Sequence, residues 1–256
     1  MNISLSIVVA VIWVLVSPSE ALAWGPLTHL YLGRELLAQG METIPSAIFS
    51  ILHAYPKDFL YGTIIADVVV GKRFQEPTGD SHTWRLVRVL QDMSRTRAHR
   101  AFAFGYQAHL AADTVAHNEY IPRFAKLPNL THTILEMRAD SLVDRKMWQK
   151  PERLVQLRND LLLEKALERT PLTFSTNKRL FQGMLSLTRL HHGRPFAHVI
   201  NRRLPYQVPE EDIRYYWQKS LFHMIESLAE GDHAPIRRGD PSGWRLRSRA
   251  TAFTGR

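Results

Sequence analysis

Apolar residues recur every three to four positions along most of the chain after Trp24. This spacing places them on one face of an α-helix, and the alternation typical of a half-buried β-strand is not sustained over any long stretch. The pattern therefore predicts an all-α protein. We expect helices at residues 28–39, 45–54, 82–97, 100–117, 131–146, 151–168, 176–190 and 209–230.

The first residues carry a different signal. Residues 7–16 form an unbroken apolar run, which is shorter than the roughly 20 residues of a membrane-spanning helix. Ala21 and Ala23 provide small side chains at the two positions that a signal peptidase reads, and this predicts cleavage before Trp24. We expect residues 1–23 to be a signal peptide and the mature protein to be exported, either periplasmic or secreted. No Lys or Arg precedes the apolar run, which leaves an uncleaved membrane anchor as the alternative.

Positive charge is concentrated at the other end of the chain. The formal net charge is +9, and the last twenty residues hold six arginines against one aspartate, with Gly, Ser and Pro interleaved. A basic stretch without an apolar period cannot build a packed core. We therefore expect one helical domain at residues 24–236 and a flexible basic tail at residues 237–256. A solvated tail is favoured over one that binds anionic lipid or nucleic acid.

Histidines and acids stand at helical spacings in the first half of the chain. The 256 residues include no cysteine, which excludes disulfides and thiolate zinc sites. Any metal must therefore be held by histidine, carboxylate or backbone groups. His109, Asp113 and His117 stand at positions i, i+4 and i+8. On an α-helix such positions drift by only about 40° per step, so the three side chains are expected on one face.

A second pair repeats this spacing. His132 and Glu136 stand at i and i+4, and Asp140 continues their face one turn later. Neutral imidazole and carboxylate are ligands of zinc, although they also suit other divalent ions. Two such pairs together with the histidine at i+8 favour a metal site over histidines that only cap, pair or pack.

These residues belong to a longer series of motifs. In order along the chain, the motifs are Trp24-Gly-Pro-Leu-Thr-His29, Phe59-Leu-Tyr-Gly-Thr-Ile-Ile-Ala-Asp67, His82-Thr-Trp84, His109-x3-Asp113-x3-His117 and His132-x3-Glu136. The series resembles the zinc-dependent phospholipase C family, which includes secreted bacterial three-zinc phospholipases and the catalytic domain of glycosylphosphatidylinositol-specific phospholipase D. The resemblance covers roughly half of the chain. The chain departs from the secreted bacterial enzymes in the tighter spacing from His109 to His117, and in Ala66, where a proline is expected.

The resemblance implies a multi-helix domain of the phospholipase C and nuclease type with a cluster of three zinc ions. Asp67 is the implied catalytic carboxylate, which orients or deprotonates the attacking water. Cleavage before Trp24 would create a free amine, whose pKa of roughly 8 lets a metal displace its proton. The implied ligands are Trp24 (amine and carbonyl), His29 and a bridging Asp113 for the first zinc, Asp67, His82, His109 and Asp113 for the second, and His117, His132 and Glu136 for the third.

Aromatic residues beside these ligands are candidates for substrate binding. Tyr61, Phe74 and Trp84 could form a wall for a cationic headgroup, although packing in the core is the favoured account. The predicted function is a phospholipase C that acts on phospholipid at a membrane surface, with no protein partner expected. One alternative is a single-strand-specific three-zinc nuclease, the only case in which nucleic acid is a partner, although that group usually has an aspartate where Glu136 stands. The other is a membrane-associated helical protein with a non-catalytic metal site.

Overall fold

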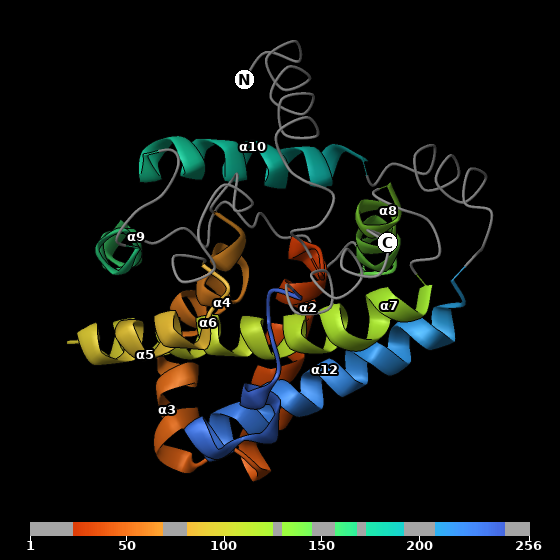
Figure 1. Ribbon diagram of the computed structural model, residues 1–256. Helices are drawn as coiled ribbons and strands as arrows, with labels where there is room; N and C mark the ends of the chain where they lie inside the picture. The colour runs from red at the N-terminus through yellow and green to blue at the C-terminus, as the bar shows by residue number, and fades with distance from the viewer. Residues whose placement is uncertain are drawn as a thin grey trace, which may run out of the picture.

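The structure is a computed structural model that describes residues 23–68, 81–124, 130–144, 157–167, 173–191 and 208–243. All regular elements within these ranges are helices (Figure 1). The all-α, multi-helix prediction is confirmed. The expected signal peptide at residues 1–23 lies outside the described residues except for Ala23. In the described part of the chain, no helix combines the length and the apolarity needed to cross a membrane.

The helices follow the predicted order, with two additions, at residues 56–65 and 121–124. The α-helices are α2 (Pro26–Gln39), α3 (Ser46–Ala54), α4 (Pro56–Ile65), α5 (Trp84–Met93), α6 (Arg97–Val115), α7 (Ile121–Phe124), α8 (Leu130–Ser141), α9 (Leu157–Ala166), α10 (Phe174–His191) and α12 (Glu210–Glu230). The sequence pattern did not predict α4. Residues Asp58–Ile65 of this helix are all buried, so it has no polar face and therefore no amphipathic period to detect.

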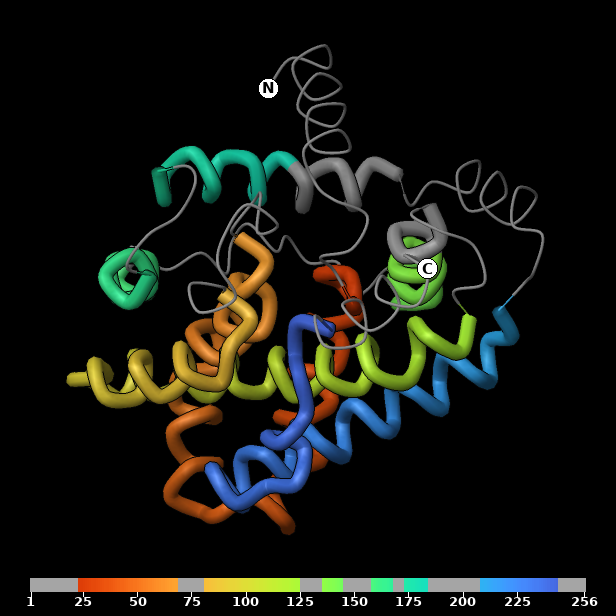
Figure 2. Tube along the Cα trace, viewed as in Figure 1, coloured from red at the N-terminus to blue at the C-terminus, as the bar shows by residue number. Residues whose placement is uncertain are grey.

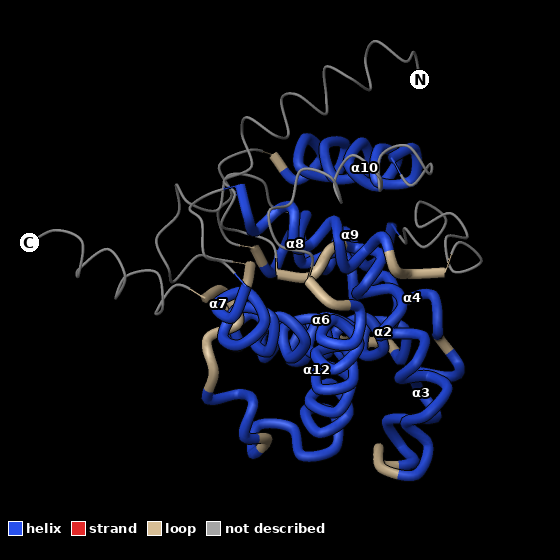
Figure 3. The backbone as a smooth tube through the Cα atoms, turned by 90° about the vertical axis from the view of Figure 1, so that its right-hand side faces the viewer, coloured by secondary structure: helices blue, strands red, loops and turns tan. Residues whose placement is uncertain are grey.

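Helix α6 runs through the middle of the molecule, with α12 alongside it (Figure 2). Helices α8, α9 and α10 lie on the opposite side of α6 from α12, as Figures 1 and 3 both show. Most of α6 is buried, and small residues such as Ala108 and Ala112 let its neighbours approach closely. Metal ligands carried by this helix would therefore lie inside the fold.

Two glycines set the distance between α4 and α6. A Cβ atom on Gly62 would lie 2.2 Å from the carbonyl oxygen of Phe102, and one on Gly105 would lie 2.0 Å from that of Phe59. Both positions require glycine, because any side chain would collide with the backbone of the facing helix. This close packing brings the carbonyl oxygen of Thr63 against His109 of α6, and the chain continues from α4 into the 3-10 turn η2 (Ala66–Val68).

The long central helix changes its geometry near its end. The α-helical part ends at Val115, and residues Ala116–Tyr120 form a π-helical turn, η5, before α7 begins. Pro122 has no backbone N–H, so it cannot form the hydrogen bond to a carbonyl one turn earlier that an α-helix would make at this position. The α-helical hydrogen-bond pattern is therefore interrupted here. The expectation of one regular helix over residues 100–117 is therefore wrong at its last two positions, and one of these is His117.

The beginning of the predicted basic tail belongs to the folded domain. Residues 237 and 238 complete a short 3-10 helix, η9 (Pro235–Arg238). Trp84 Nε1 then donates a hydrogen bond to Gly239 O at 3.0 Å, and Asn118 Nδ2 donates one to Asp240 O at 2.9 Å. Residues 237–243 are therefore packed onto the helices, which corrects the boundary at residue 236. Residues 244–256 lie outside the described residues.

Candidate metal centre

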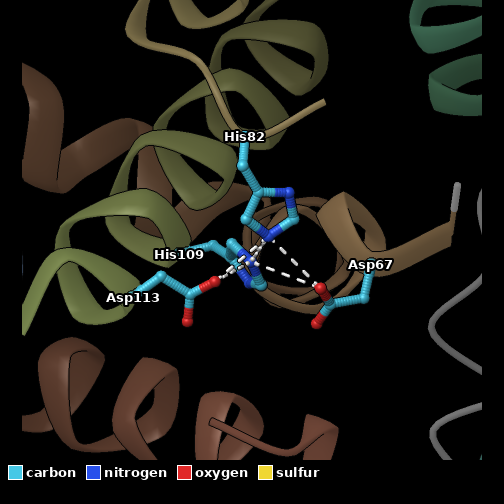
Figure 4. A group of neighbouring side chains, drawn as sticks. All are labelled: Asp67, His82, His109 and Asp113. Carbon is cyan, nitrogen blue, oxygen red and sulfur yellow. Dashed lines mark hydrogen bonds and ion pairs between the residues drawn. The ribbon is translucent and has the colours of Figure 1, made fainter. Parts of the chain in front are cut away.

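Four predicted ligands converge in the interior of the molecule (Figure 4). Asp67 comes from η2, His82 stands just before α5, and His109 and Asp113 lie one turn apart on α6. One ligand atom from each residue lies within 4.8 Å of all the others, and all four side chains are buried. The structure thus brings together residues that are up to 46 positions apart in the sequence.

The atoms that face one another are those that could bind a metal. His82 Nε2 lies 3.1 Å from Asp113 Oδ2 and 3.2 Å from Asp67 Oδ1. His109 Nε2 lies 3.1 Å from Asp113 Oδ2, 3.1 Å from His82 Nε2 and 4.0 Å from Asp67 Oδ1. These nitrogens and oxygens therefore point into a common space.

A backbone carbonyl fixes the tautomer of His109. Its Nδ1 lies 2.9 Å from the carbonyl oxygen of Thr63. Since a carbonyl can only accept, Nδ1 is the atom that carries the proton, and in the neutral ring Nε2 presents its lone pair to the cluster. A metal-binding histidine typically donates its other N–H to such an acceptor. The close packing of α4 on α6 thus orients the ligand.

His82 is held to α6 through its neighbour Ser81. Ser81 Oγ lies 3.1 Å from His82 Nδ1, and the hydroxyl of Tyr106 donates a hydrogen bond to Ser81 O at 2.7 Å. Tyr106 lies on α6, one turn before His109. The segment that carries His82 is therefore anchored to α6, the helix that carries His109 and Asp113.

His29 approaches the cluster from α2. Its Nε2 lies 3.0 Å from Asp113 Oδ1, and its ring stacks on that of His109 with the centroids 3.9 Å apart. The two oxygens of Asp113 thus face different imidazoles, with Oδ1 toward His29 and Oδ2 toward His82 and His109. This is the arrangement expected of a carboxylate that bridges two cations.

The pKa shifts of the clustered residues favour the binding of a cation. Burial by itself would raise the pKa of Asp113, but the adjacent His109 and His29 outweigh it and hold that pKa well below its ordinary value. Burial, reinforced by the charge of His109, lowers the pKa of His29. An ionised carboxylate and neutral imidazoles are the protonation states in which both groups bind metals.

Buried polar atoms support the same conclusion. Among the described residues, neither oxygen of Asp113 and neither ring nitrogen of His29 has a partner in hydrogen-bond geometry. Burying a carboxylate without hydrogen bonds is unfavourable unless a cation compensates its charge. Histidine and carboxylate are the ligands that zinc takes in catalytic sites. The residues present therefore fit a bound divalent metal.

Comparison with protein families agrees with this geometry. The model of the family described as "Zinc dependent phospholipase C" matches residues 28–177. The chain belongs to this family. Searches among curated proteins and among solved structures gave no match. Membership points to a hydrolytic enzyme and to zinc as the metal, and the matched range contains all four clustered residues.

Trp24, which precedes the match to the zinc-dependent phospholipase C family, is fixed by its side chain. The indole is fully buried, it stacks on Tyr120 at 4.6 Å between centroids, and its Nε1 donates a hydrogen bond to Ser220 Oγ at 3.1 Å. Ser220 could not be predicted as a partner, because nothing in the local sequence pattern marks a contact 196 positions away. This packing holds the backbone of Trp24 at the start of α2, five residues before His29.

Asp140 holds the beginning of α2 from across the molecule. Its Oδ1 accepts hydrogen bonds from the backbone N–H of Thr28 at 2.9 Å and the hydroxyl of Thr28 at 2.7 Å, and its Oδ2 accepts one from the backbone N–H of Leu27 at 3.3 Å. Burial raises the pKa of Asp140 to about 6, although the hydrogen bonds from Thr28 oppose this shift. The i+4 spacing predicts Asp140 on the face of Glu136 but does not indicate this role.

The third predicted zinc site stays a prediction. His117 and Glu136 are both buried, but among the described residues neither belongs to the group of four potential ligands. His132 lies on α8, and its side chain is outside the part that the structure describes. The i+8 spacing assumed a regular helix, whereas His117 lies in the π-helical turn η5.

The predicted aromatic wall is not supported as a whole. Tyr61 is fully buried and its hydroxyl donates a hydrogen bond to Asp160, so it is a core residue rather than part of a binding surface. Trp84 is partly buried, and the guanidinium of Arg237 lies over its ring, 4.9 Å from the centroid. The protein itself thus supplies a cation to this ring. Phe74 lies outside the described residues.

Proposed function

We propose that the protein is a phospholipase C that hydrolyses the phosphodiester of phospholipids at a three-zinc centre. The observation that carries the proposal is the position of Asp113, whose two oxygens face separate sets of imidazoles. A single-ion site would not need a carboxylate shared between His29 and the pair of His82 and His109. The adjacent motifs around Trp24 and around His117, His132 and Glu136 would complete the ligand set.

The residues that would hold the metals fall into three sets. Trp24, His29 and Asp113 would form the first, Asp67, His82, His109 and Asp113 the second, and His117, His132 and Glu136 the third. Bound zinc lowers the pKa of a water molecule toward 7 and neutralises charge on phosphoryl oxygens. The fold contributes the lowered pKa of His29, an ionised Asp113 and a buried setting in which electrostatic interactions are strong.

Asp67 is the proposed catalytic carboxylate. Its Oδ1 lies on the edge of the cluster, 3.2 Å from His82 Nε2, whereas Asp113 lies between the imidazoles of His29, His82 and His109. From this edge Asp67 can accept a proton from a water that attacks phosphorus. The new P–O bond forms as the P–O bond to glycerol breaks, and the released diacylglycerol oxygen takes up a proton.

The proposed substrate is phospholipid in a membrane surface, and the proposed location is outside the cytoplasm after cleavage before Trp24. A substrate panel tests both this proposal and its rival. The mature protein is incubated with phosphatidylcholine vesicles and with single-stranded DNA, with and without a chelator, and its N-terminus is sequenced. We expect chelator-sensitive release of the phosphorylated headgroup, about three zinc ions per chain by analogy with the family, and an N-terminal tryptophan.

Two outcomes would contradict the proposal. Cleavage of DNA without any lipid hydrolysis would make the protein a nuclease. Tight zinc binding that stabilises the fold while neither substrate is hydrolysed would favour a structural metal site. Asp67→Asn is the matched variant, because it keeps the size of the side chain and removes its charge. We expect it to retain zinc better than Asp113→Asn but to lose hydrolysis.

A further inference from the structure

A short segment near the end of the described chain lies directly against the metal-bearing helix. This segment, residues 239–243, is here called the strap. It falls well outside residues 28–177, the range that the family model matches. Trp84 Nε1 donates a hydrogen bond to Gly239 O at 3.0 Å, and Asn118 Nδ2 donates one to Asp240 O at 2.9 Å. The strap is therefore held at two points, one at the start of α5 and the other in η5.

Hydrogen bonds within the strap define its shape. Asp240 Oδ1 accepts from the backbone N–H of Ser242 at 2.9 Å and from its hydroxyl at 2.7 Å. An aspartate that binds the backbone two residues later closes a tight turn. Gly243 then follows with φ +66, a conformation that favours glycine. The turn directs the backbone of Gly243 toward α6 and η5.

Gly243 packs against His117. A Cβ atom on Gly243 would lie 3.0 Å from each of Cβ, Cγ and Nδ1 of His117. At the other end of the strap, a Cβ atom on Gly239 would lie 2.4 Å from Cγ2 of Thr114. The strap thus follows the helix from Thr114 to His117, and glycine is the residue that permits the approach at both ends.

Among the predicted ligands on α6 and η5, His117 depends most on contacts with other segments for the orientation of its side chain. It lies in the π-helical turn, so the α-helical register that aligns His109 with Asp113 does not extend to it. A metal ligand works only when its rotamer is held by the surrounding packing. The backbone of Gly243 lies close to the imidazole ring and limits where the ring can turn.

We propose that the strap is a positioning element for His117, with Gly243 as the residue that sets the direction of the imidazole. This inference rests on the proposed function, in which His117 is a ligand of the third zinc. Gly243 itself would touch neither metal nor substrate. It would act through His117. The absence of a Cβ atom at Gly243 leaves room for the imidazole ring, and the backbone of Gly243 prevents the ring from turning toward the strap.

The chain offers a matched control in Gly231. This glycine also has a positive φ, of +58, but a Cβ atom there would meet no described residue within 4 Å. Gly231→Ala therefore introduces backbone strain alone, whereas Gly243→Ala introduces backbone strain together with contact to His117. We expect both variants to lower Tm by several degrees. Only Gly243→Ala should weaken zinc binding.

The measurement is zinc per chain at a series of free zinc concentrations set by a competing chelator. Loss of a supporting group typically lowers metal affinity by about 10–100-fold, and we expect a loss of this size at one zinc for Gly243→Ala. His117→Ala should lose the same zinc. The double variant should be no worse than His117→Ala alone, because both changes act on one ligand.

Three results would overturn the proposal: Gly243→Ala binding zinc as Gly231→Ala does, His117→Ala keeping every zinc, or the two losses adding in the double variant. If Gly243→Ala does not fold, Asn118→Ala carries the test, since it removes the hydrogen bond to Asp240 O without filling space beside His117. Unchanged zinc binding in that variant would overturn the proposal as well. The test measures zinc binding, so it remains informative even if the protein hydrolyses no phospholipid. A failure of this inference can therefore be told apart from a failure of the proposed function.

Discussion

The two ends of the α6–η5 helix hold their candidate ligands in different ways. His109 and Asp113 lie in the regular α-helical part, one turn apart, and both point into the cluster (Figure 4). His117 lies one turn later in the sequence, but in a π-helical turn, where Gly243 of the strap packs against it. Regular helical geometry is enough to align the first two residues, whereas the third depends on a segment more than 120 positions away. Spacing in a sequence is thus a good guide only while the helix keeps its register.

The largest expected effect comes from removing the shared carboxylate. Asp113→Ala should abolish hydrolysis and remove at least two zinc ions, because both of its oxygens face candidate ligands. His117→Ala should remove only the third. Zinc content and activity of the two variants measure this difference. His223→Ala is the control, since His223 pairs with Glu226 at 2.8 Å on α12 and should change neither quantity. Equal zinc loss in the Asp113 and His117 variants would contradict the separation of the two sites.

Metal removal should be the next largest effect. Stripping zinc with a chelator leaves an uncompensated, buried Asp113, and a ligand present at about 100 times its Kd stabilises a folded protein by about 2.7 kcal/mol. We expect Tm to fall by several degrees and to recover when zinc is added back. Differential scanning calorimetry would show this. A Tm that is indifferent to the chelator would contradict the assignment of a metal to the cluster.

A substitution at Gly105 tests whether the close packing of α4 on α6 supports the metal ligands on α6. Gly105→Ala would place a Cβ atom 2.0 Å from the carbonyl oxygen of Phe59, and such overpacking costs about 1–3 kcal/mol. The displaced α4 would also move Thr63 O away from His109 Nδ1. We expect a lower urea midpoint together with weaker zinc binding. Gly231→Ala, at an open position, should leave zinc binding unchanged.

Asp140 tests the support of α2. Asp140→Ala leaves two buried backbone N–H groups and the hydroxyl of Thr28 without their acceptor, so we expect a loss of about 2–4 kcal/mol. Asp140→Asn keeps an acceptor oxygen and should lose less. Urea unfolding at fixed zinc measures both variants. Equal losses would show that the charge of Asp140, rather than its acceptor oxygens, holds α2.

The last prediction concerns the pH dependence of stability. Burial raises the pKa of Asp140 from 3.8 to about 6, so the folded state binds this proton more tightly than the unfolded state does. Its contribution to stability is therefore greatest at low pH and is lost as the pH rises from about 4 to about 6. Relative to Asp140→Asn, the metal-free wild type should lose up to about 3 kcal/mol over this range. A difference in stability between wild type and Asp140→Asn that does not change with pH would contradict the raised pKa of Asp140.

The sequence by itself determined the fold class and the chemistry of the site. Apolar spacing predicted helices in the observed order, and the spacings of His109, Asp113 and the other ligand-type residues indicated a metal site. It could not predict α4, because a helix buried on all sides has no amphipathic period. Nor could it show that residues 237–243 fold back onto the helices, since their basic composition resembles that of a solvated tail.

Only the tertiary structure decided which side chains meet. The approach of α4 to α6, permitted by Gly62 and Gly105, places Thr63 O where it fixes the tautomer of His109. Asp140, Ser220 and Gly243 reach the site from distant elements, and no local pattern marks such partners. The physical reason is that periodicity reports the faces of one element, whereas ligand direction and proton position depend on contacts between elements.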